Sequence, residues 1–372
     1  MKKQVICIAV LVLALAGCGQ SKQQESPMAF QTATPRESAV LPSATPTAPP
    51  VMEIVVPTPT PGPVIPEGCA LNVLTGEYID EEIAARRPVA VVINNLYAAL
   101  PQSGVSQAAV YYEVIAEGAI TRIIAVFQDF DAAKIGSIRS TRHYFLDFAL
   151  DNDAIFAHHG QSPQGEIDLA ALKIDNLNGM KLDGTYYWRD PVRASQPGMK
   201  EHSSYTSAEN IWKYIEKVGY RTERAAGFDG MFAFYNGPTV PAGGVAAVQI
   251  ETPFANAFRP SFQYDAETKL YYRTEYNEAQ IDVETGGQLA VTNVVVQNVV
   301  VRDLNDAAGR RDVALVSSGT GYLFTNGVVV PLTWEKTSRQ SPTQWFDADG
   351  NKLKLNVGKT WFCVTAMDPI YE

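Results

Sequence analysis

The 372-residue sequence lacks the motifs that mark several common enzyme classes. It contains no GxSxG nucleophile elbow, no P-loop, no glycine-rich dinucleotide pattern and no HExxH zinc motif. It also lacks a CxxC pair of the kind that binds zinc. The sequence therefore indicates no enzyme class, and we expect neither a metal nor a cofactor.

Long apolar runs are absent too. The N-terminal run over residues 5–16 is too short to cross a bilayer, which needs ~20 apolar residues. Two lysines precede this run, and Leu-Ala-Gly-Cys at residues 15–18 ends it, which is typical of a lipoprotein signal peptide. We therefore expect residues 1–18 to be a signal peptide with a lipobox. Acyl chains such as palmitate on Cys18 would then anchor the protein to the outer face of a bacterial cell membrane. The alternative is an ordinary secretory signal in which Cys18 has no role.

Cysteine is scarce, with four in the whole chain. Cys7 leaves with the signal peptide and Cys18 takes the lipid, so Cys69 and Cys363 remain. An exported protein permits a disulfide between these two. The equal alternative is that each is a small buried apolar side chain.

Basic residues are outnumbered by acidic ones, 30 against 40. Removing the signal peptide takes two basic residues and no acidic ones, which leaves a net charge of −12. This charge argues against nucleic acid as a partner and against adhesion to anionic lipid. Hydrophobic residues make up 46% of the chain, enough to bury more than one core.

The pattern along the chain predicts four segments. After the signal peptide, residues 19–66 form a Pro/Thr-rich linker whose composition is that of disordered chain. Residues 67–237 alternate apolar runs with helical patterns, which predicts an α/β domain. Residues 238–372 predict a smaller, mostly antiparallel β domain, so the fold class is α+β overall.

Individual elements follow from the spacing of apolar residues. In the first domain we expect strands at 89–93, 108–114, 120–127 and 154–157, and helices at 139–150, 166–172 and 207–218. In the second domain the strands are expected at 245–250, 258–264, 270–273, 289–301, 313–316, 321–324, 328–334 and 360–365. The dipeptide Asn326-Gly327 between two apolar runs predicts a two-residue hairpin turn.

The densest polar cluster is at residues 136–143, where we expect a helix to begin. Free N–H groups at a helix start favour an anion. Arg139 and Arg142 are three residues apart, so both can project from one helix face beside the hydroxyl of Ser140. The alternative is that the two arginines only pair with nearby carboxylates.

Two further groups of residues are candidates for the same site. His158 and His159 follow a predicted buried strand, and ligands of open α/β sheets usually bind at strand ends. Neighbouring strand residues face opposite sides, which argues against a metal held by both histidines. Arg189, Arg193 and His202 lie in an irregular segment rich in aromatic and polar residues, as functional loops often are. The alternative for that segment is an ordinary surface loop.

Secondary candidates lie on the first strands. Asn94 ends one strand. Glu113 and Glu117 are four residues apart, so in a regular strand they share a face on which two carboxylates could do acid–base chemistry. The alternative is that they neutralise Arg122 and Arg139.

Taken together, several strings resemble the YerB-type lipoproteins, a bacterial family of unknown function. They lie at residues 87–95, 117–122, 136–142 and 158–163, with two more at 334–336 and 355–361. The resemblance extends over residues 75–367 and implies an N-terminal α/β domain and a smaller β-rich domain, with no known activity. The sequence departs from the family at Ser203, where we expect an asparagine after the histidine.

Three functions remain open on this basis. In the first, the arginines and His158 line a cleft for an anionic cell-envelope ligand, and the β domain docks a protein partner. In the second, the protein is an envelope hydrolase or transferase with His158 or His159 as the base and Glu117 as the acid. In the third, it is a scaffold whose polar clusters are purely structural.

Overall fold

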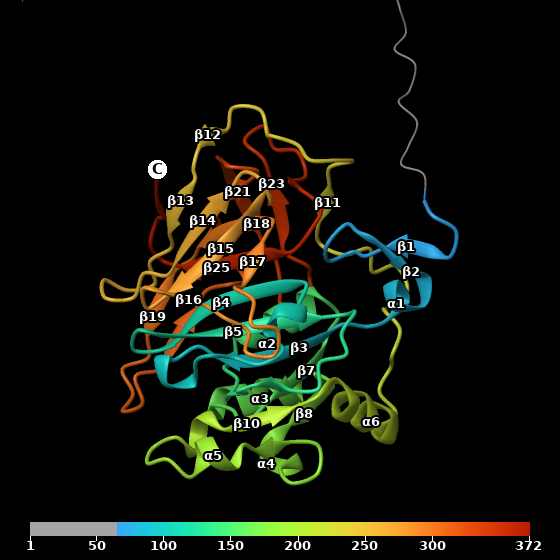
Figure 1. Ribbon diagram of the computed structural model, residues 1–372, viewed down its shortest axis with the longest axis vertical. Coiled ribbons are helices and arrows are strands. Elements are labelled where there is room, and N and C mark those ends of the chain that lie inside the picture. The colour runs from blue at the N-terminus through green and yellow to red at the C-terminus, as the bar shows by residue number, and fades with distance from the viewer. Residues whose placement is uncertain (1–64) are drawn as a thin grey trace, which may run out of the picture. The chain divides into compact units, whose positions relative to one another are not determined.

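The computed structural model describes residues 65–372 (Figure 1). The signal peptide, Cys18 and nearly all of the predicted linker lie outside the described residues. The described residues 65–372 belong to one compact unit. Among the described helices, none has the length and apolar character needed to cross a membrane.

An eleven-stranded sheet forms the centre of this unit. Its order is β12 (Val245–Ala246), β22 (Val328–Glu335), β21 (Ser318–Thr325), β18 (Asn293–Asn298), β25 (Thr360–Thr365), β4 (Val110–Glu117), β5 (Ile120–Phe127), β3 (Val89–Asn94), β7 (Ile155–His158) and β8 (Asn176–Asn178), with β23 (Gln344–Phe346) paired to β22. The strand β25 lies parallel to β18 on one side and to β4 on the other. Strands from both predicted segments therefore share one sheet, and a division into two folding units stays a prediction.

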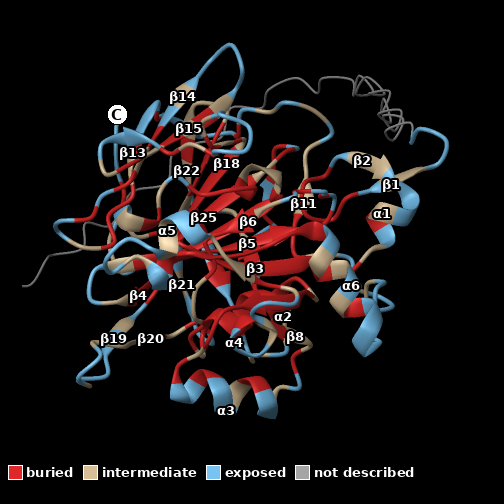
Figure 2. Ribbon diagram, turned by 60° about the horizontal axis from the view of Figure 1, so that its bottom comes forward, coloured by how far each residue is buried: buried red, intermediate tan, exposed pale blue. Residues whose placement is uncertain are grey.

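The apolar strands of this sheet are buried on both faces, as Figure 2 shows for β3, β5 and β25. In β3, Ala90 and Val92 belong to one hydrophobic core, whereas Val89, Val91 and Ile93 belong to the other. Successive strand residues face opposite sides, so a strand between two cores must be apolar throughout. This requirement explains the uninterrupted run that the sequence shows there.

Helices cover part of the sheet. The principal ones are α2 (Phe145–Asp151), α3 (Pro163–Ala171) and α6 (Ala208–Val218), and the short ones are α1 (Glu81–Ala85), α4 (Gly179–Leu182) and α5 (Pro191–Ala194). The helix predicted at 207–218 is confirmed. Ser207 caps α6 by accepting a hydrogen bond from the backbone N–H of Asn210 at 3.1 Å. Gly219 ends it in the left-handed conformation, with φ 72°.

A second, six-stranded sheet packs against the large sheet and forms a second layer of the fold. Its order is β16 (Glu278–Ala279), β15 (Leu270–Glu275), β14 (Ser261–Asp265), β13 (Gln249–Glu251) and β26 (Ile370–Tyr371), with β17 (Ala290–Val291) paired to β15. Its buried side chains Phe262 and Tyr271 pack into the same core as Val89. The predicted hairpin is confirmed, since Asn326 and Gly327 join β21 to β22 with φ 50° and 77°. The α/β fold with a β-rich C-terminal region is likewise confirmed.

Short strand pairs complete the fold. They are β1 (Cys69–Leu71) with β2 (Tyr78–Asp80); β6 (Ile135–Gly136) with β10 (Ser204–Thr206) and β9 (Trp188–Arg189); β11 (Ala233–Phe234) with β24 (Lys354–Leu355); and β19 (Val301–Asp303) with β20 (Arg311–Val313). Three single 3₁₀ turns occur in connecting segments: η1 (Tyr97–Ala99) and η2 (Val105–Gln107) between β3 and β4, and η3 (Lys200–His202) between α5 and β10.

The two cysteines of the described chain are both free, so the disulfide alternative does not hold in this structure. Cys363 lies in β25 at the centre of the large sheet, with no exposed surface. Burial raises the pKa of its thiol to about 12. Cys363 is thus the small buried apolar side chain of the other alternative, whereas Cys69 lies partly exposed in β1.

Candidate functional site

The polar segment at residues 136–143 does not begin a helix, and the prediction of a helix at 139–150 is wrong in its first half. The helix α2 begins only at Phe145. Before it, the N–H of Arg139 donates to the carbonyl of Val92 at 2.9 Å, and the carbonyl of Arg139 accepts from the N–H of His159 at 3.0 Å. These residues are extended and pair with both neighbouring segments. The backbone groups of Arg139 are therefore not free to bind an anion.

Arg142 and Arg122 share one carboxylate. Arg122 Nη2 lies 2.9 Å from one oxygen of Glu117, and the Arg142 guanidinium pairs with the other oxygen. Burial lowers the pKa of Arg122 to about 9 and that of Arg142 to about 10. Arg142 therefore pairs with a nearby carboxylate, which is the alternative considered for it from the sequence. Its guanidinium is buried in this cluster and does not face solvent.

Glu113 and Glu117 do not share their surroundings, contrary to the prediction for a regular strand. The register of β4 against β5 shifts between Ile115 and Glu117. Such a bulge changes the side to which the following residue points. Glu117 consequently meets Arg122, whereas Glu113 points into a separate buried cluster with Arg273.

The two adjacent histidines face different partners, as predicted. His158 has no exposed surface, and its ring nitrogens lie 2.8 Å from the carbonyl of Gly160 and 3.3 Å from the side-chain oxygen of Asn176. Burial lowers the pKa of the His158 ring. The neutral ring carries one N–H and can donate to only one of these two oxygens. Because the ring has no exposed surface, neither nitrogen is open to a substrate.

His159 is held between Arg189 and Ser204. Arg189 Nη2 lies 2.6 Å from His159 Nε2, and Ser204 Oγ lies 2.8 Å from Nδ1. A guanidinium can only donate, so Nε2 accepts and Nδ1 carries the proton. Burial, together with the charge of Arg189, lowers the pKa of His159 to about 4. The ring is therefore neutral at neutral pH and positions Arg189.

Arg139 and Arg189 converge on the 3₁₀ turn η3. Arg139 Nη1 donates to the backbone carbonyl of Glu201 at 3.1 Å and to its carboxylate at 3.0 Å. Arg189 donates to the carbonyl of Lys200 at 2.8 Å and to the carboxylate of Asp183 at 3.0 Å. A shallow cavity of about 390 Å³ opens here, lined by Arg189, Gly198, Lys200 and Glu201. We call it the arginine hollow.

Arg139 contacts Glu201 at this hollow without lining it, and the remaining candidates do not line it either. His202 Nδ1 lies 2.8 Å from the side-chain nitrogen of Asn94, and Ser140 donates to the carbonyl of His159 at 3.0 Å. Arg193 instead donates to the carbonyls of Ala99 and Leu100, at 2.8 and 3.3 Å. Burial lowers the pKa of His202. These side chains are thus engaged by neighbouring segments of the chain.

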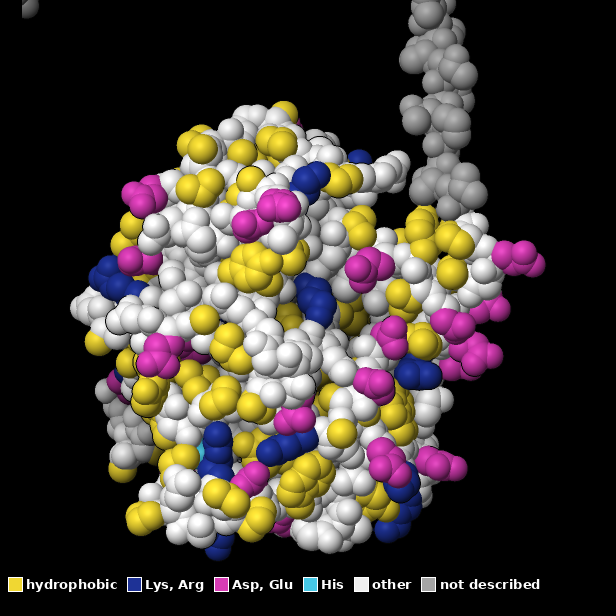
Figure 3. All heavy atoms as spheres, in the orientation of Figure 1, with side chains coloured by type: hydrophobic (Ala, Val, Ile, Leu, Met, Phe, Trp, Pro, Cys, Tyr) yellow, Lys and Arg dark blue, Asp and Glu magenta, His cyan; other side chains and the backbone are white. Residues whose placement is uncertain are grey.

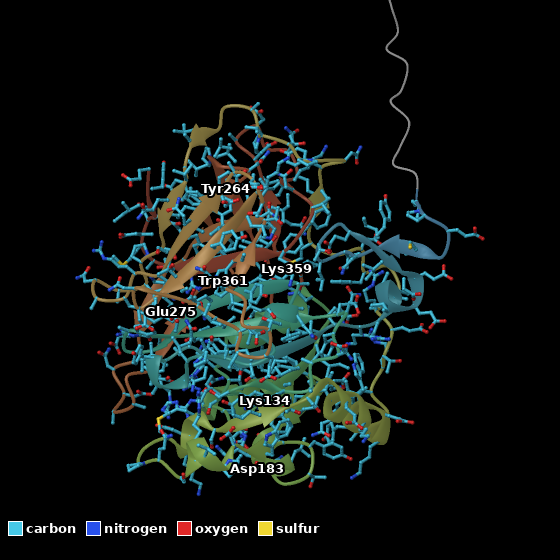
Figure 4. All side chains as sticks on the ribbon, viewed as in Figure 1. Lys134, Asp183, Tyr264, Glu275, Lys359 and Trp361 are labelled. Atoms are coloured by element: carbon cyan, nitrogen blue, oxygen red, sulfur yellow. The ribbon has the colours of Figure 1, made fainter. Side chains whose placement is uncertain are left out.

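Charges of both signs surround the arginine hollow. On the face drawn in Figure 3, basic and acidic side chains lie next to one another in the lower part of the molecule. Figure 4 labels Asp183 there, well below Glu275 and Trp361. In the described part of the chain, no group of three His, Cys, Asp or Glu side chains is placed to hold a metal ion.

A second polar cluster, which sequence reasoning missed, is completely buried. Arg273 Nη2 lies 2.7 Å from Glu113, whose carboxylate also accepts from the indole N–H of Trp361 at 3.2 Å. Asn95 bridges Glu113 and Glu275, at 3.1 and 2.7 Å. One signal was present in the sequence: Arg273 and Glu275 alternate with Tyr272 and Thr274, so both charges share the face of a half-buried strand.

Two further details describe this buried cluster. The Arg273 guanidinium stacks on two rings, 4.3 Å from the centroid of Trp361 and 5.0 Å from that of Phe262. Arg273 Nη1 and Glu275 Oε2 have no hydrogen-bond partner. With Glu113 and Glu275 sharing one guanidinium, the cluster holds one carboxylate more than it has cations. It joins β4 of the large sheet to β15 of the second layer.

Fold and site together place the chain in a family. The model described as "Protein of unknown function (DUF3048) N-terminal domain" matches residues 74–221, and that of the corresponding C-terminal domain matches residues 250–362. These matches cover more than half of the chain, so the protein belongs to this family.

Two comparisons specify the relationship. The protein named "Putative lipoprotein YerB" from Bacillus subtilis (strain 168) is 35% identical over 290 residues, which are 77% of this chain and 84% of that protein. The crystal structure of the YerB protein from Bacillus subtilis matches with a TM-score of 0.70 and 33% identity, over 80% of this chain and 97% of the other. The resemblance to YerB-type lipoproteins is thereby confirmed.

Proposed function

We propose that the protein is an extracytoplasmic lipoprotein, anchored to the outer face of the cell membrane by acyl chains on Cys18, whose arginine hollow binds an anionic envelope ligand. The lipobox at residues 15–18 supports the anchor, as does the name of the Bacillus subtilis relative. The observation that carries the binding proposal is the convergence of Arg139 and Arg189 on one turn.

The arginine hollow suits an anion because the carboxylate that now pairs with Arg139, that of Glu201, is easily displaced. The side chain of Glu201 is 61% exposed, and that of Arg139 is 22% exposed. Exposed ion pairs of this kind contribute only ~0–1 kcal/mol, so a phosphate or carboxylate ligand can replace Glu201 at little cost. Planar guanidinium groups then bind its oxygens in pairs.

The hydrolase alternative has little support in the geometry. His158 has no exposed surface, and His159 is held by Arg189 and Ser204. Glu117 is enclosed by two guanidinium groups. A general base must reach a substrate proton, and none of these side chains is free to do so.

Thermal unfolding of the full chain in detergent tests the binding proposal, with citrate and inorganic phosphate as probes. A ligand that binds only the folded state at 100 times its Kd adds ~2.7 kcal/mol, a rise of several degrees in Tm. Arg139→Ala and Arg189→Ala should lose this rise. Arg302→Ala is the control, because Arg302 is likewise paired with a carboxylate, that of Asp312 at 3.4 Å, and does not line the hollow. An equal rise in Arg139→Ala and in the parent would contradict the proposal.

The anchor is tested separately by Cys18→Ser. The parent protein, which keeps Cys18, should fractionate with membranes after cell lysis and incorporate labelled palmitate. The variant should do neither, because it lacks the acyl chains, whose burial in the bilayer contributes ~0.8 kcal/mol of membrane-binding free energy per methylene. Membrane fractionation that survives the change, with label still incorporated, would exclude Cys18 as the lipid attachment site.

A further inference from the structure

A second cavity lies at one end of the six-stranded sheet, away from the arginine hollow. It has a volume of about 340 Å³ and is lined by Asn256, Ala257, Phe258, Arg259, Tyr276 and Asn277. The turn between β15 and β16 supplies Tyr276 and Asn277, and the loop between β13 and β14 supplies the others. We call it the aromatic hollow.

Three aromatic rings pack together beside this hollow; Phe258 and Tyr276 line it, and Tyr97 does not. The ring of Tyr276 lies 5.3 Å from that of Phe258 and 5.4 Å from that of Tyr97, which meets it edge to face at 78°. Phe258 packs into the core, whereas Tyr97 is 58% exposed. The Tyr276 hydroxyl donates to the carbonyl of Asn95 at 3.2 Å. Tyr97 is thus an exposed ring held against the half-buried Tyr276, which in turn packs on the buried Phe258.

Free polar groups lie beside these rings. In the described part of the chain, the side-chain amides of Asn256 and Asn277 have no hydrogen-bond partner, and both residues are exposed. Arg259 uses Nε to donate to the carbonyl of Asn256 at 3.1 Å, and its Nη1 lies 3.7 Å from Glu251. The remaining guanidinium donors and both amides are therefore available to a ligand.

We propose that the aromatic hollow binds a sugar ring of a polysaccharide. A sugar ring has an apolar face of C–H groups and a rim of hydroxyls, and it needs a rigid aromatic surface flanked by amide and guanidinium groups. The volume is at the small end of the ~300–1,000 Å³ usual for ligand sites, which suits one ring rather than a large cofactor.

Other ligands fit this hollow less well. A nucleobase would also stack on the rings, but a net charge of −12 on the mature chain repels the phosphates of a nucleic acid. A free anion has no apolar face and would leave the aromatic rings unused. The sugar site shares no lining residue with the arginine hollow, so it does not depend on the function proposed above.

Calorimetric titration of the full chain tests this site, in a detergent without a sugar headgroup. The probes are chitotetraose and maltotetraose, two uncharged oligosaccharides with and without acetamido groups. Asn277→Gly removes one amide, and glycine accepts the φ of 62° at that position. Asn305→Gly is the matched control, since Asn305 also has positive φ, 54°, in an exposed turn elsewhere. Tyr97→Ala removes the exposed ring without opening the core.

The parent should bind at least one of the two sugars. Asn277→Gly and Tyr97→Ala should each weaken that binding about tenfold, which corresponds to 1.4 kcal/mol. Asn305→Gly should bind the sugar like the parent. Arg139→Ala should also bind the sugar like the parent, although it is expected to lose phosphate binding at the arginine hollow. Failure of both sugars to bind the parent at millimolar concentration would overturn the proposal. An equal loss of affinity in Asn305→Gly would overturn it as well.

Discussion

The buried cluster of Glu113, Arg273 and Glu275 allows a quantitative prediction about stability and pH. The side chains of all three residues have no exposed surface. Burial raises the pKa of Glu275 well above its ordinary 4.5, and the nearby charge of Glu113 raises it further, although Arg273 acts in the opposite direction. Glu113 is bonded directly to Arg273 at 2.7 Å, so we expect the retained proton to reside on Glu275.

The raised pKa fixes the sign of the pH dependence. Above pH 4.5 the unfolded chain releases the proton of Glu275, whereas the folded protein keeps it until its own higher pKa is reached. The folded state thus binds more protons in this window, and its free energy of unfolding falls as pH rises, by about 1.4 kcal/mol per pH unit. Below pH 4.5 both states are protonated and the stability is fully present.

Glu275→Gln should remove this fall in the free energy of unfolding at rising pH. The amide has nearly the same shape, and its oxygen can still accept the hydrogen bond that Asn95 donates to Glu275 at 2.7 Å. Relative to the parent, the free energy of unfolding of the variant should therefore increase by about 1.4 kcal/mol for each pH unit above 4.5, up to the pKa of Glu275 in the folded protein.

Urea unfolding at pH 5, 6 and 7 measures this difference. Glu278→Gln is the control, because Glu278 pairs with Glu275 across the β15–β16 hairpin but is exposed. Its pH profile should run parallel to that of the parent. If the profiles of Glu275→Gln and the parent were also parallel, the folded protein would not hold the extra proton, and our account of the cluster would be refuted.

Three further changes have definite expected outcomes. Gly327→Ala should destabilise the protein by more than about 1 kcal/mol in urea unfolding, because φ is 77° and the added Cβ would lie 2.8 Å from the ring of Tyr264; an unchanged midpoint would contradict the turn geometry. Ser207→Ala should cost ~1 kcal/mol through loss of the cap of α6, measured the same way, and a gain in stability would contradict the cap. In the native protein a thiol reagent should modify Cys69 and spare Cys363, as peptide mass spectrometry would detect, and rapid labelling of Cys363 would contradict its burial.

Local patterns in the sequence predicted much of the architecture. The uninterrupted apolar run of β3, the cap and stop of α6 and the turn at Asn326-Gly327 each depend on a few neighbouring residues. Propensity and apolar periodicity act at this range, so the elements appear where the pattern places them. The predicted lipobox at residues 15–18 is equally local, since its pattern needs no tertiary contact to be recognised.

The segment at 136–143 shows where local reasoning fails. Its residues suit a helix start, yet its backbone pairs with β3 on one side and with His159 on the other. Pairing between segments that are distant in the sequence outweighs a weak helical preference. The same is true of β4, where a one-residue bulge sends Glu113 and Glu117 to different partners.

The sequence by itself determined the fold class, the elements with a strong period, the family resemblance and the predicted anchor at Cys18. Only the tertiary structure decided which charges meet: Arg142 with Glu117, Arg139 with Glu201, and Arg273 with Glu113, the last across 160 residues of chain. An ion pair depends on side-chain positions set by the packing of the sheets, and residue type alone does not encode that distance. For this reason the sequence supplied the arginines of a candidate site, and the fold decided that Arg139 and Arg189 face solvent while Arg142 does not.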